Sequence, residues 1–201
     1  MNNAASATDR KFVYLASASP RRADLLSQLG LAFSVTPADI DETPRCGEAP
    51  DAYVERVARD KAHAAWAALQ ARDVPVLAAD TAVVVDGNIL GKPSNERDAA
   101  RMLSELSGRR HDVLTAVAVL GADRESAAVC HTVVVFRPIE PDEISAYWHT
   151  GEPHDKAGGY AIQGLGAMFV EEIQGSYSGV MGLPVYETAR LLAGFGYRLL
   201  F

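Results

Sequence analysis

Two serines and two arginines follow a short apolar run near the N-terminus, and all four could bind phosphate: Ser17, Ser19, Arg21 and Arg22. Pro20 suits the first position of a helix, and Ser19 suits the position that caps it. A helix N-terminus offers free backbone N–H groups and the positive end of the helix dipole, and arginine binds phosphate oxygens with parallel donors. The segment therefore indicates an oligophosphate site. An ordinary Ser-Pro helix start with two solvated arginines would have the same sequence pattern.

Three carboxylates could hold a metal ion or accept a proton from water. Asp80 follows an apolar run that predicts a strand at 74–79, and ligands of open α/β sheets collect beyond the carboxyl ends of strands. Asp41 and Glu42 lie in an acidic loop, and Mg²⁺ is commonly held by one or two carboxylates together with substrate phosphates. Asp41 and Asp80 could hold such an ion, and Asp80 could accept the proton. A turn cap at Asp80 and a merely solvated acidic loop are the alternatives.

Two lysines and a glutamine have surroundings that suit a nucleotide. Lys61 falls on the apolar stripe of a helix predicted at 51–69, where a lysine either reaches water or meets an anion. Lys92 stands between a glycine and a proline, in a rigid turn. Gln163 lies in a glycine-rich segment whose backbone can approach a ligand, and its amide can read a base edge. Each feature alone also fits a purely structural role.

The elements that must position these residues alternate between strands and helices. We expect strands at 12–16, 33–35, 74–79, 113–120, 129–136 and 168–173, and helices at 20–29, 51–69, 95–106, 141–149 and 184–193. Two further short strands, 83–85 and 89–90, flank a hairpin turn at Asp86-Gly87-Asn88. This order predicts an α/β fold with a mixed sheet.

Composition excludes several classes of protein. The 201 residues are 48% hydrophobic and 22% charged, as in an ordinary globular domain. A net charge of −7 argues against a nucleic-acid partner, because such proteins carry clustered positive charge. Cys46 and Cys130 lie far apart, which disfavours a zinc site or a disulfide scaffold. Neither a signal peptide nor an apolar run of roughly 20 residues is visible, so we expect a cytoplasmic protein without a membrane partner. We expect residues 1–11 to form a disordered extension.

Taken together, the motifs resemble those of the Maf family of nucleotide pyrophosphatases. They occur in the family's order from residue 12 onward, and the matching segments are Leu15-Ala16-Ser17-Ala18-Ser19-Pro20-Arg21-Arg22, Ile40-Asp41-Glu42, Ala58-Arg59-Asp60-Lys61-Ala62, Ala78-Ala79-Asp80-Thr81, Gly91-Lys92-Pro93, Leu106-Ser107-Gly108, Asp155-Lys156-Ala157-Gly158-Gly159-Tyr160-Ala161-Ile162-Gln163-Gly164 and Gly175-Ser176-Tyr177-Ser178-Gly179-Val180-Met181-Gly182-Leu183-Pro184. The resemblance implies one two-lobed domain over 12–201 with a long mixed sheet and a central cleft, similar to the inosine triphosphate pyrophosphatases (Ham1-like). It also implies a homodimer and a divalent metal cation, Mg²⁺ or Mn²⁺.

The resemblance further implies a reaction and a role for each site residue. A nucleoside triphosphate would be hydrolysed to the monophosphate and pyrophosphate, with Asp80 as the proton acceptor and Asp41 as the second carboxylate of the catalytic and metal centre. The residues expected to bind substrate are Ser17, Arg21, Arg22, Lys61, Lys92, Thr81 and Gln163. Among these, Arg21, Thr81 and Gln163 match the positions that separate the family's branches. Their combination resembles the branch that prefers dTTP and UTP, whereas the 7-methyl-GTP branch typically has tryptophan where this chain has Arg21.

Asp41 departs from part of the family, in which some members have glutamate, and its shorter side chain reaches less far. The implied biological role is house-cleaning, with modified pyrimidine triphosphates as further targets. One alternative is a non-catalytic nucleotide sensor or a protein-binding regulator of septum formation, to which the family has been linked. A nucleotide kinase or transferase is another, but the sequence has no GxxxxGK[ST] segment.

Overall fold

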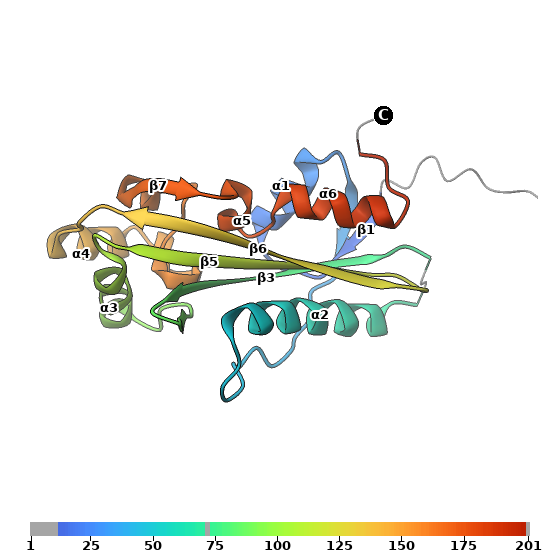
Figure 1. Cartoon of the computed structure of the whole chain (residues 1–201), viewed down its shortest axis with the longest axis horizontal. Coiled ribbons are helices and arrows are strands. Elements are labelled where there is room, and N and C mark those ends of the chain that lie inside the picture. The colour runs from blue at the N-terminus through green and yellow to red at the C-terminus, as the bar shows by residue number, and fades with distance from the viewer. Residues whose placement is uncertain (1–11, 71–72, 200–201) are drawn as a thin grey trace, which may run out of the picture.

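In the computed structural model, which describes residues 12–70 and 73–199, seven strands form one mixed sheet along the length of the molecule (Figure 1). The order is β2-β1-β3-β5-β6-β7, with β4 paired to β3 off this path. β1 pairs in parallel with β2 and β3, and the other pairs are antiparallel. The strands are β1 (Phe12–Leu15), β2 (Ala32–Val35), β3 (Val76–Val85), β4 (Asn88–Leu90), β5 (Arg110–Leu120), β6 (Glu125–Phe136) and β7 (Val170–Gln174).

The long strand β3 has a break along one edge. Its other edge pairs continuously with β5 over residues 76–84. On the first edge, β1 pairs with β3 at 76–77 and β4 pairs with it at 83–85. Among the described residues no strand pairs with this edge at 78–82, because β1 ends early and the chain turns into a helix. The middle of β3 is therefore open to a ligand from the side.

Helices cover both faces of the sheet. α2 lies along one face, and α1, α5 and α6 lie on the other, while α3 and α4 pack at the end of the sheet that carries β7 (Figure 1). The helices are α1 (Pro20–Gln28), α2 (Pro50–Ala68), α3 (Glu96–Leu106), α4 (Pro141–His149), α5 (Tyr177–Met181) and α6 (Val185–Gly194). Three short 3-10 helices lie between α4 and β7, namely η1 (Glu152–Asp155), η2 (Ala157–Gly159) and η3 (Leu165–Phe169). Within the described residues, none of the helices combines the length and hydrophobicity needed to cross a membrane.

Alternation along β3 sorts its side chains between the two faces. Ala78 and Ala82 are buried in the cluster under α2, whereas Leu77 and Ala79 are buried in the cluster under α1 and α6. Because successive residues of a strand point to opposite faces, Asp80 belongs to the α2 face and its neighbour to the α1 face. The small alanines let α2 lie close to the strand, which brings side chains of α2 within reach of Asp80.

The predicted α/β class with a mixed sheet is confirmed, but the expected end of a strand at residue 79 is wrong. β3 continues through Asp80 to Val85 and so merges the two strands expected at 74–79 and 83–85. A polar residue does not end a strand when its backbone stays paired and its side chain has a partner on the sheet face. Asp80 has both, since it pairs with Ala116 of β5 and its carboxylate accepts a hydrogen bond.

Smaller differences concern the bounds of three later strands. The strand expected at 168–173 begins at Val170, because the preceding residues form η3. The strands β5 and β6 begin earlier than expected, since each continues to pair with the other toward its polar end. The extension expected at 1–11 lies outside the described residues, and the two-lobed division of 12–201 stays a prediction.

Candidate active site

A cavity of about 540 Å³ opens where the edge of β3 is unpaired, beside the N-terminus of α1. Every predicted site residue except Asp41 lines it: Ser17, Arg21, Arg22, Lys61, Asp80, Thr81, Lys92 and Gln163. The sequence predicted that the ligand site lies beyond the carboxyl end of a strand. This holds for β1, which ends at Leu15 shortly before Ser17, but not for β3, which continues past Asp80 to Val85. The structure thus brings together segments that are far apart in the sequence.

A buried lysine joins two carboxylates at the cavity wall. Lys61 lies on the buried stripe of α2, which packs on the β3 face that carries Asp80. Its Nζ donates to Asp80 Oδ1 at 2.8 Å and lies 3.0 Å from Glu42 Oε1. Lys61 and Asp80 are only 8% and 5% exposed. Taking charges out of water is costly, so a buried ion pair that borders a cavity is a candidate functional group.

Burial changes the basicity of Asp80. The pKa of its carboxyl is raised above the ordinary value because burial disfavours the charged form, while the cations of Lys61 and Arg22 oppose that shift. A carboxylate with a raised pKa holds a proton more strongly than an ordinary aspartate, which suits a group that takes a proton from water. The ion pair with Lys61 also fixes the orientation of the carboxylate.

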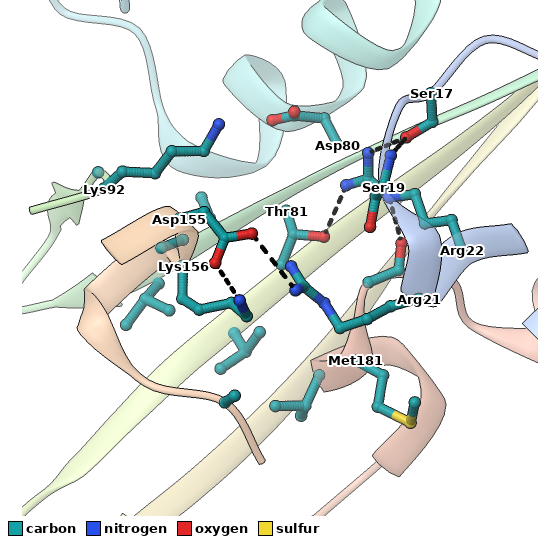
Figure 2. A pocket seen from close by; sticks show the side chains of 18 of the residues that line it. Ser17, Ser19, Arg21, Arg22, Asp80, Thr81, Lys92, Asp155, Lys156 and Met181 are labelled. Carbon is teal, nitrogen blue, oxygen red and sulfur yellow. Dashed lines mark hydrogen bonds and ion pairs between the residues drawn. The ribbon is translucent and has the colours of Figure 1, made fainter. Parts of the chain in front are cut away.

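Arg22 is held by three hydrogen bonds that link α1, β3 and the end of α5 (Figure 2). Its Nε donates to Gly182 O at 2.8 Å, Nη1 to Ser17 Oγ at 3.1 Å and Nη2 to Thr81 Oγ1 at 3.3 Å. Burial lowers the pKa of Arg22 and the Asp80 carboxylate opposes this, but a guanidinium stays charged in proteins. Its further N–H groups are left to meet an anion in the cavity.

The hydroxyl of Thr81 is part of a short hydrogen-bond chain. Thr115 Oγ1 on β5 lies 3.0 Å from Thr81 Oγ1 and donates to Gly179 O at 2.8 Å. Since Thr115 has one hydroxyl proton and gives it to the carbonyl, Thr81 donates to Thr115 while it accepts from Arg22. Thr115, which the sequence analysis did not single out, therefore fixes the orientation of Thr81. Only the strand register, which places the two threonines opposite each other, identifies it.

Two further cations share one carboxylate across the cavity. Asp155 lies between Arg21 and Lys156, with Arg21 Nη1 3.9 Å from Asp155 Oδ2 and Lys156 paired to the other oxygen (Figure 2). Lys92 reaches the cavity from the turn after β4 with an exposed side chain. Together with Arg22, these side chains give the cavity several positive charges at sites that phosphate oxygens could reach.

The N-terminus of α1 adds backbone donors to this wall. Ser19 occupies the capping position and Pro20 begins the helix, as the sequence predicted. Among the described residues no side chain caps this helix end, and the Ser19 amide donates to Ser17 Oγ at 3.2 Å. The first-turn N–H groups beside the cavity are therefore left without a capping side chain, which suits an anion.

Asp41 does not reach the cavity, whereas its neighbour Glu42 does. Asp41 is exposed, and its Oδ1 accepts from the Thr43 amide at 2.9 Å. Hydrogen bonds from the side chain and from the backbone of Thr43 lower the pKa of its carboxyl. Glu42 lines the cavity and contacts Lys61. The structure thus does not bring Asp41 together with Asp80. Nothing in the local sequence shows which of these two adjacent acids reaches the cavity. The structure shows it through the contact between Glu42 and Lys61 of α2.

The carboxylates that line the cavity suit a hard divalent cation. Glu42 and Asp80 both contact Lys61 Nζ, so a cationic group already lies between two carboxylates in this structure. Across residues 12–70 and 73–199 there is no group of three or more His, Cys, Asp or Glu side chains that could hold a metal by themselves. A pair of carboxylates completed by substrate phosphates and water is the arrangement that Mg²⁺ prefers over an all-protein cage. The residues present therefore fit Mg²⁺ or Mn²⁺ held jointly with a triphosphate.

Sequence comparisons agree with these motifs. The model of the Maf-like protein family matches residues 12–195. The dTTP/UTP pyrophosphatase of Methylobacillus flagellatus is 54% identical over 184 residues, which cover 92% of this chain and 92% of the relative. The dTTP/UTP pyrophosphatase of Aromatoleum aromaticum is 51% identical over 199 residues, which cover 93% of this chain and 97% of the relative.

Among solved structures, the Ham1 protein of Staphylococcus aureus matches 65% of this chain and 73% of its own, with 19% identity and a TM-score of 0.45.

Proposed function

The chain belongs to the family of Maf-like proteins, and on that premise we propose that it is a nucleoside triphosphate pyrophosphatase that acts on dTTP and UTP. Relatives that carry this name are about half identical to it over nearly its whole length. The single observation that carries the proposal is the buried Lys61–Asp80 ion pair, which lies in the same cavity as Arg22 and the open N-terminus of α1. The ion pair suits a proton acceptor, and Arg22 with the N-terminus of α1 suits phosphates.

Phosphate binding is assigned to Ser17, Arg21, Arg22, Lys61 and Lys92, with the backbone N–H groups of α1. Arg22 is already oriented by its bonds to the scaffold, so little side-chain entropy is lost when it meets a phosphate. Arg21 is held less tightly, at 3.9 Å from Asp155, and can turn toward the substrate. Positive charge near the bond between the α- and β-phosphates would stabilise the leaving pyrophosphate.

In the proposed hydrolysis, a water molecule attacks the α-phosphorus. Asp80 accepts a proton from this water as its oxygen bonds to phosphorus, and the bond from the α-phosphorus to the bridging oxygen breaks, so that pyrophosphate leaves. Lys61 keeps the Asp80 carboxylate oriented during this step. Glu42 and Asp80 are the residues that would hold the divalent cation, in place of the Asp41 and Asp80 pair expected from the sequence. When bound, the cation would neutralise phosphate charge and make the water more acidic.

Base selection is assigned to Arg21, Thr81 and Gln163, which all line the cavity. The amide of Gln163 can both donate and accept, as the edge of a pyrimidine requires. A homodimer and a cytoplasmic location are part of the same proposal and rest on the family resemblance.

A substrate panel tests the proposal. With Mg²⁺ and separately with Mn²⁺, the protein should release pyrophosphate from dTTP and UTP faster than from CTP, dGTP, ITP or 7-methyl-GTP. A strong preference for 7-methyl-GTP would keep the reaction and overturn the assignment of the three specificity residues. Tight binding of dTTP without turnover would favour a nucleotide sensor, and release of a diphosphate would favour a γ-phosphate enzyme.

A further inference from the structure

The segment that carries Gln163 is folded around two side chains that do not line the cavity. Tyr147 lies near the end of α4, and Glu152 begins η1. Tyr147 contacts the backbone before Gln163, at residue 161, and Glu152 contacts the backbone after it, at residues 165 and 166. Their positions fix where this segment enters and leaves the cavity wall.

A chain of hydrogen bonds joins these groups. The Ala161 amide donates to Tyr147 Oη at 3.0 Å, and Tyr147 Oη donates to Glu152 Oε1 at 2.6 Å. The same carboxylate accepts from the amides of Leu165 at 3.0 Å and Gly166 at 2.9 Å. Hydrogen bonds to a carboxylate are stronger than neutral ones, so the two ends of the segment are held together by one charged group.

The ionisation states of both side chains suit these bonds. Burial and the Glu152 carboxylate raise the pKa of Tyr147, so that the phenol keeps the proton it donates. Burial would raise the pKa of Glu152, but the hydrogen bonds from Tyr147 and from the two amides outweigh it and lower that pKa. Glu152 therefore stays a carboxylate and accepts at both oxygens.

Two glycines show how closely the backbone of this segment packs against Tyr147 and Glu152. A Cβ on Gly164 would collide with the Glu152 carboxylate, and a Cβ on Gly166 would lie 2.7 Å from Tyr147 Oη and 2.8 Å from Ala161 O. No side chain fits at either position without moving the pair. The glycines thus permit close contact between backbone and carboxylate, which a flexible loop would not need.

Gln163 has no such support of its own. Its side chain is exposed and, among the described residues, makes no hydrogen bond. The region of the cavity that its amide can reach therefore depends on its backbone, and hydrogen bonds to Tyr147 and Glu152 hold the backbone on both sides of it.

We propose that Glu152 and Tyr147 are positioning residues that clamp the segment 161–166 and thereby place the Gln163 amide against the pyrimidine base. This inference rests on the proposed function, in which Gln163 contacts the base. Because a base contact made equally in the ground state and the transition state changes KM and not kcat, the clamp should govern KM for dTTP and UTP.

Steady-state kinetics of Glu152→Gln test the clamp. Glutamine keeps the shape of the side chain, but its NH₂ group cannot accept, so at least one bond of the clamp is lost. KM for dTTP should rise by about tenfold, the effect of losing roughly one charge-assisted hydrogen bond, while kcat stays within about twofold. The preference for dTTP over CTP should fall by a similar factor. The matched control is Glu143→Gln, which removes a charge of α4 that is paired with Arg137 and should leave KM unchanged.

A double-mutant cycle with Gln163→Ala separates positioning from general loss of stability. If Glu152 acts through Gln163, the double variant should have the KM of Gln163→Ala alone, whereas independent effects that multiply would overturn the inference. A lower kcat with unchanged KM would overturn it as well.

Amide hydrogen exchange gives a readout that does not depend on catalysis. In Glu152→Gln, the amides of Ala161, Leu165 and Gly166 should exchange faster than in the wild type, with the rest of the sheet unaffected. Unchanged exchange at these amides would refute the clamp itself. By contrast, absence of pyrophosphate release from dTTP by the wild type would refute the proposed function and leave the exchange result to stand alone.

Discussion

Asp80 and Thr81 are adjacent in sequence, yet their side chains meet different partners. Since β3 continues through both residues, Asp80 points to the α2 face and meets Lys61, while Thr81 points to the other face and meets Arg22. One strand thereby carries the proposed proton acceptor and a support for the arginine that is proposed to bind phosphate. The unpaired edge at this point of β3 lets both side chains border one cavity.

Replacing the proton acceptor should remove turnover and leave the fold intact. Asp80→Asn preserves shape but lowers basicity, so kcat for dTTP should fall by a factor of about a hundred to ten thousand, which is typical of general acid–base catalysis. Circular dichroism should show that the variant is still folded at the assay temperature. Asp112→Asn, on the neighbouring strand and outside the cavity, is the control and should keep full activity. A near-normal rate in Asp80→Asn would remove Asp80 from the mechanism.

The two adjacent acids of the loop before α2 should behave differently when changed in the same way. Glu42→Gln removes a carboxylate that lines the cavity, so the Mg²⁺ concentration for half-maximal activity should rise by about tenfold or more. Asp41→Asn changes an exposed group that does not line the cavity and is hydrogen-bonded to Thr43, and it should leave the Mg²⁺ requirement unchanged. The Mg²⁺ titration of pyrophosphate release measures both variants. The opposite ranking would restore Asp41 as the metal ligand.

At the scale of elements, the loop that carries Glu42 is attached to α2 through one arginine. Arg56 donates to both oxygens of Glu48, at 2.6 Å and 2.8 Å, and to Thr43 O at 3.2 Å. Glu48 in turn accepts from the Arg45 amide at 2.9 Å. Because Lys61 lies on the same helix, this attachment fixes the position of Glu42 relative to Lys61.

The attachment should make stability depend on pH. The hydrogen bonds from Arg56 and Arg45 lower the pKa of Glu48 from its ordinary 4.5 to about 2. A carboxyl whose pKa is lower in the folded state stabilises the fold above its unfolded pKa and loses that contribution as pH falls through its folded pKa. The free energy of unfolding in urea should therefore differ between wild type and Glu48→Gln at pH 6, and the difference should shrink as the pH falls from about 4.5 toward about 2. A difference that stays constant over this range would mean that Glu48 is not ionised in the bond.

Periodicity in the sequence identified most elements and the position of Lys61 on the buried face of α2, because burial follows from the spacing of apolar residues. Periodicity failed to predict features that do not depend on the spacing of apolar residues. The continuation of β3 past Asp80 depends on pairing with β5 and on a partner from another helix. The choice between Asp41 and Glu42 depends on the path of a loop. Tyr147 and Glu152 accept hydrogen bonds from backbone amides of another segment, and no pattern of residue spacing predicts such bonds.

At the scale of the whole molecule, the cavity exists because a long strand has two short neighbours on one edge. β1 and β4 leave the middle of β3 unpaired on that edge, and helices on opposite faces of the sheet bring Lys61 and Arg22 to that place. The glycine-rich segment 155–163 adds the remaining wall and with it Gln163. Three separate parts of the chain therefore meet at one break in the sheet, and to these the proposed function assigns phosphate binding, base binding and proton transfer.

The central claim is that water attacks the α-phosphorus of dTTP with Asp80 as the proton acceptor. The most direct measurement is hydrolysis of dTTP in water labelled with heavy oxygen, with both products analysed by mass spectrometry. The account predicts one heavy oxygen in dTMP and none in pyrophosphate. Heavy oxygen in pyrophosphate would place the attack on the β-phosphorus, and formation of dTDP with labelled phosphate would place it on the γ-phosphorus. Either result would contradict the account.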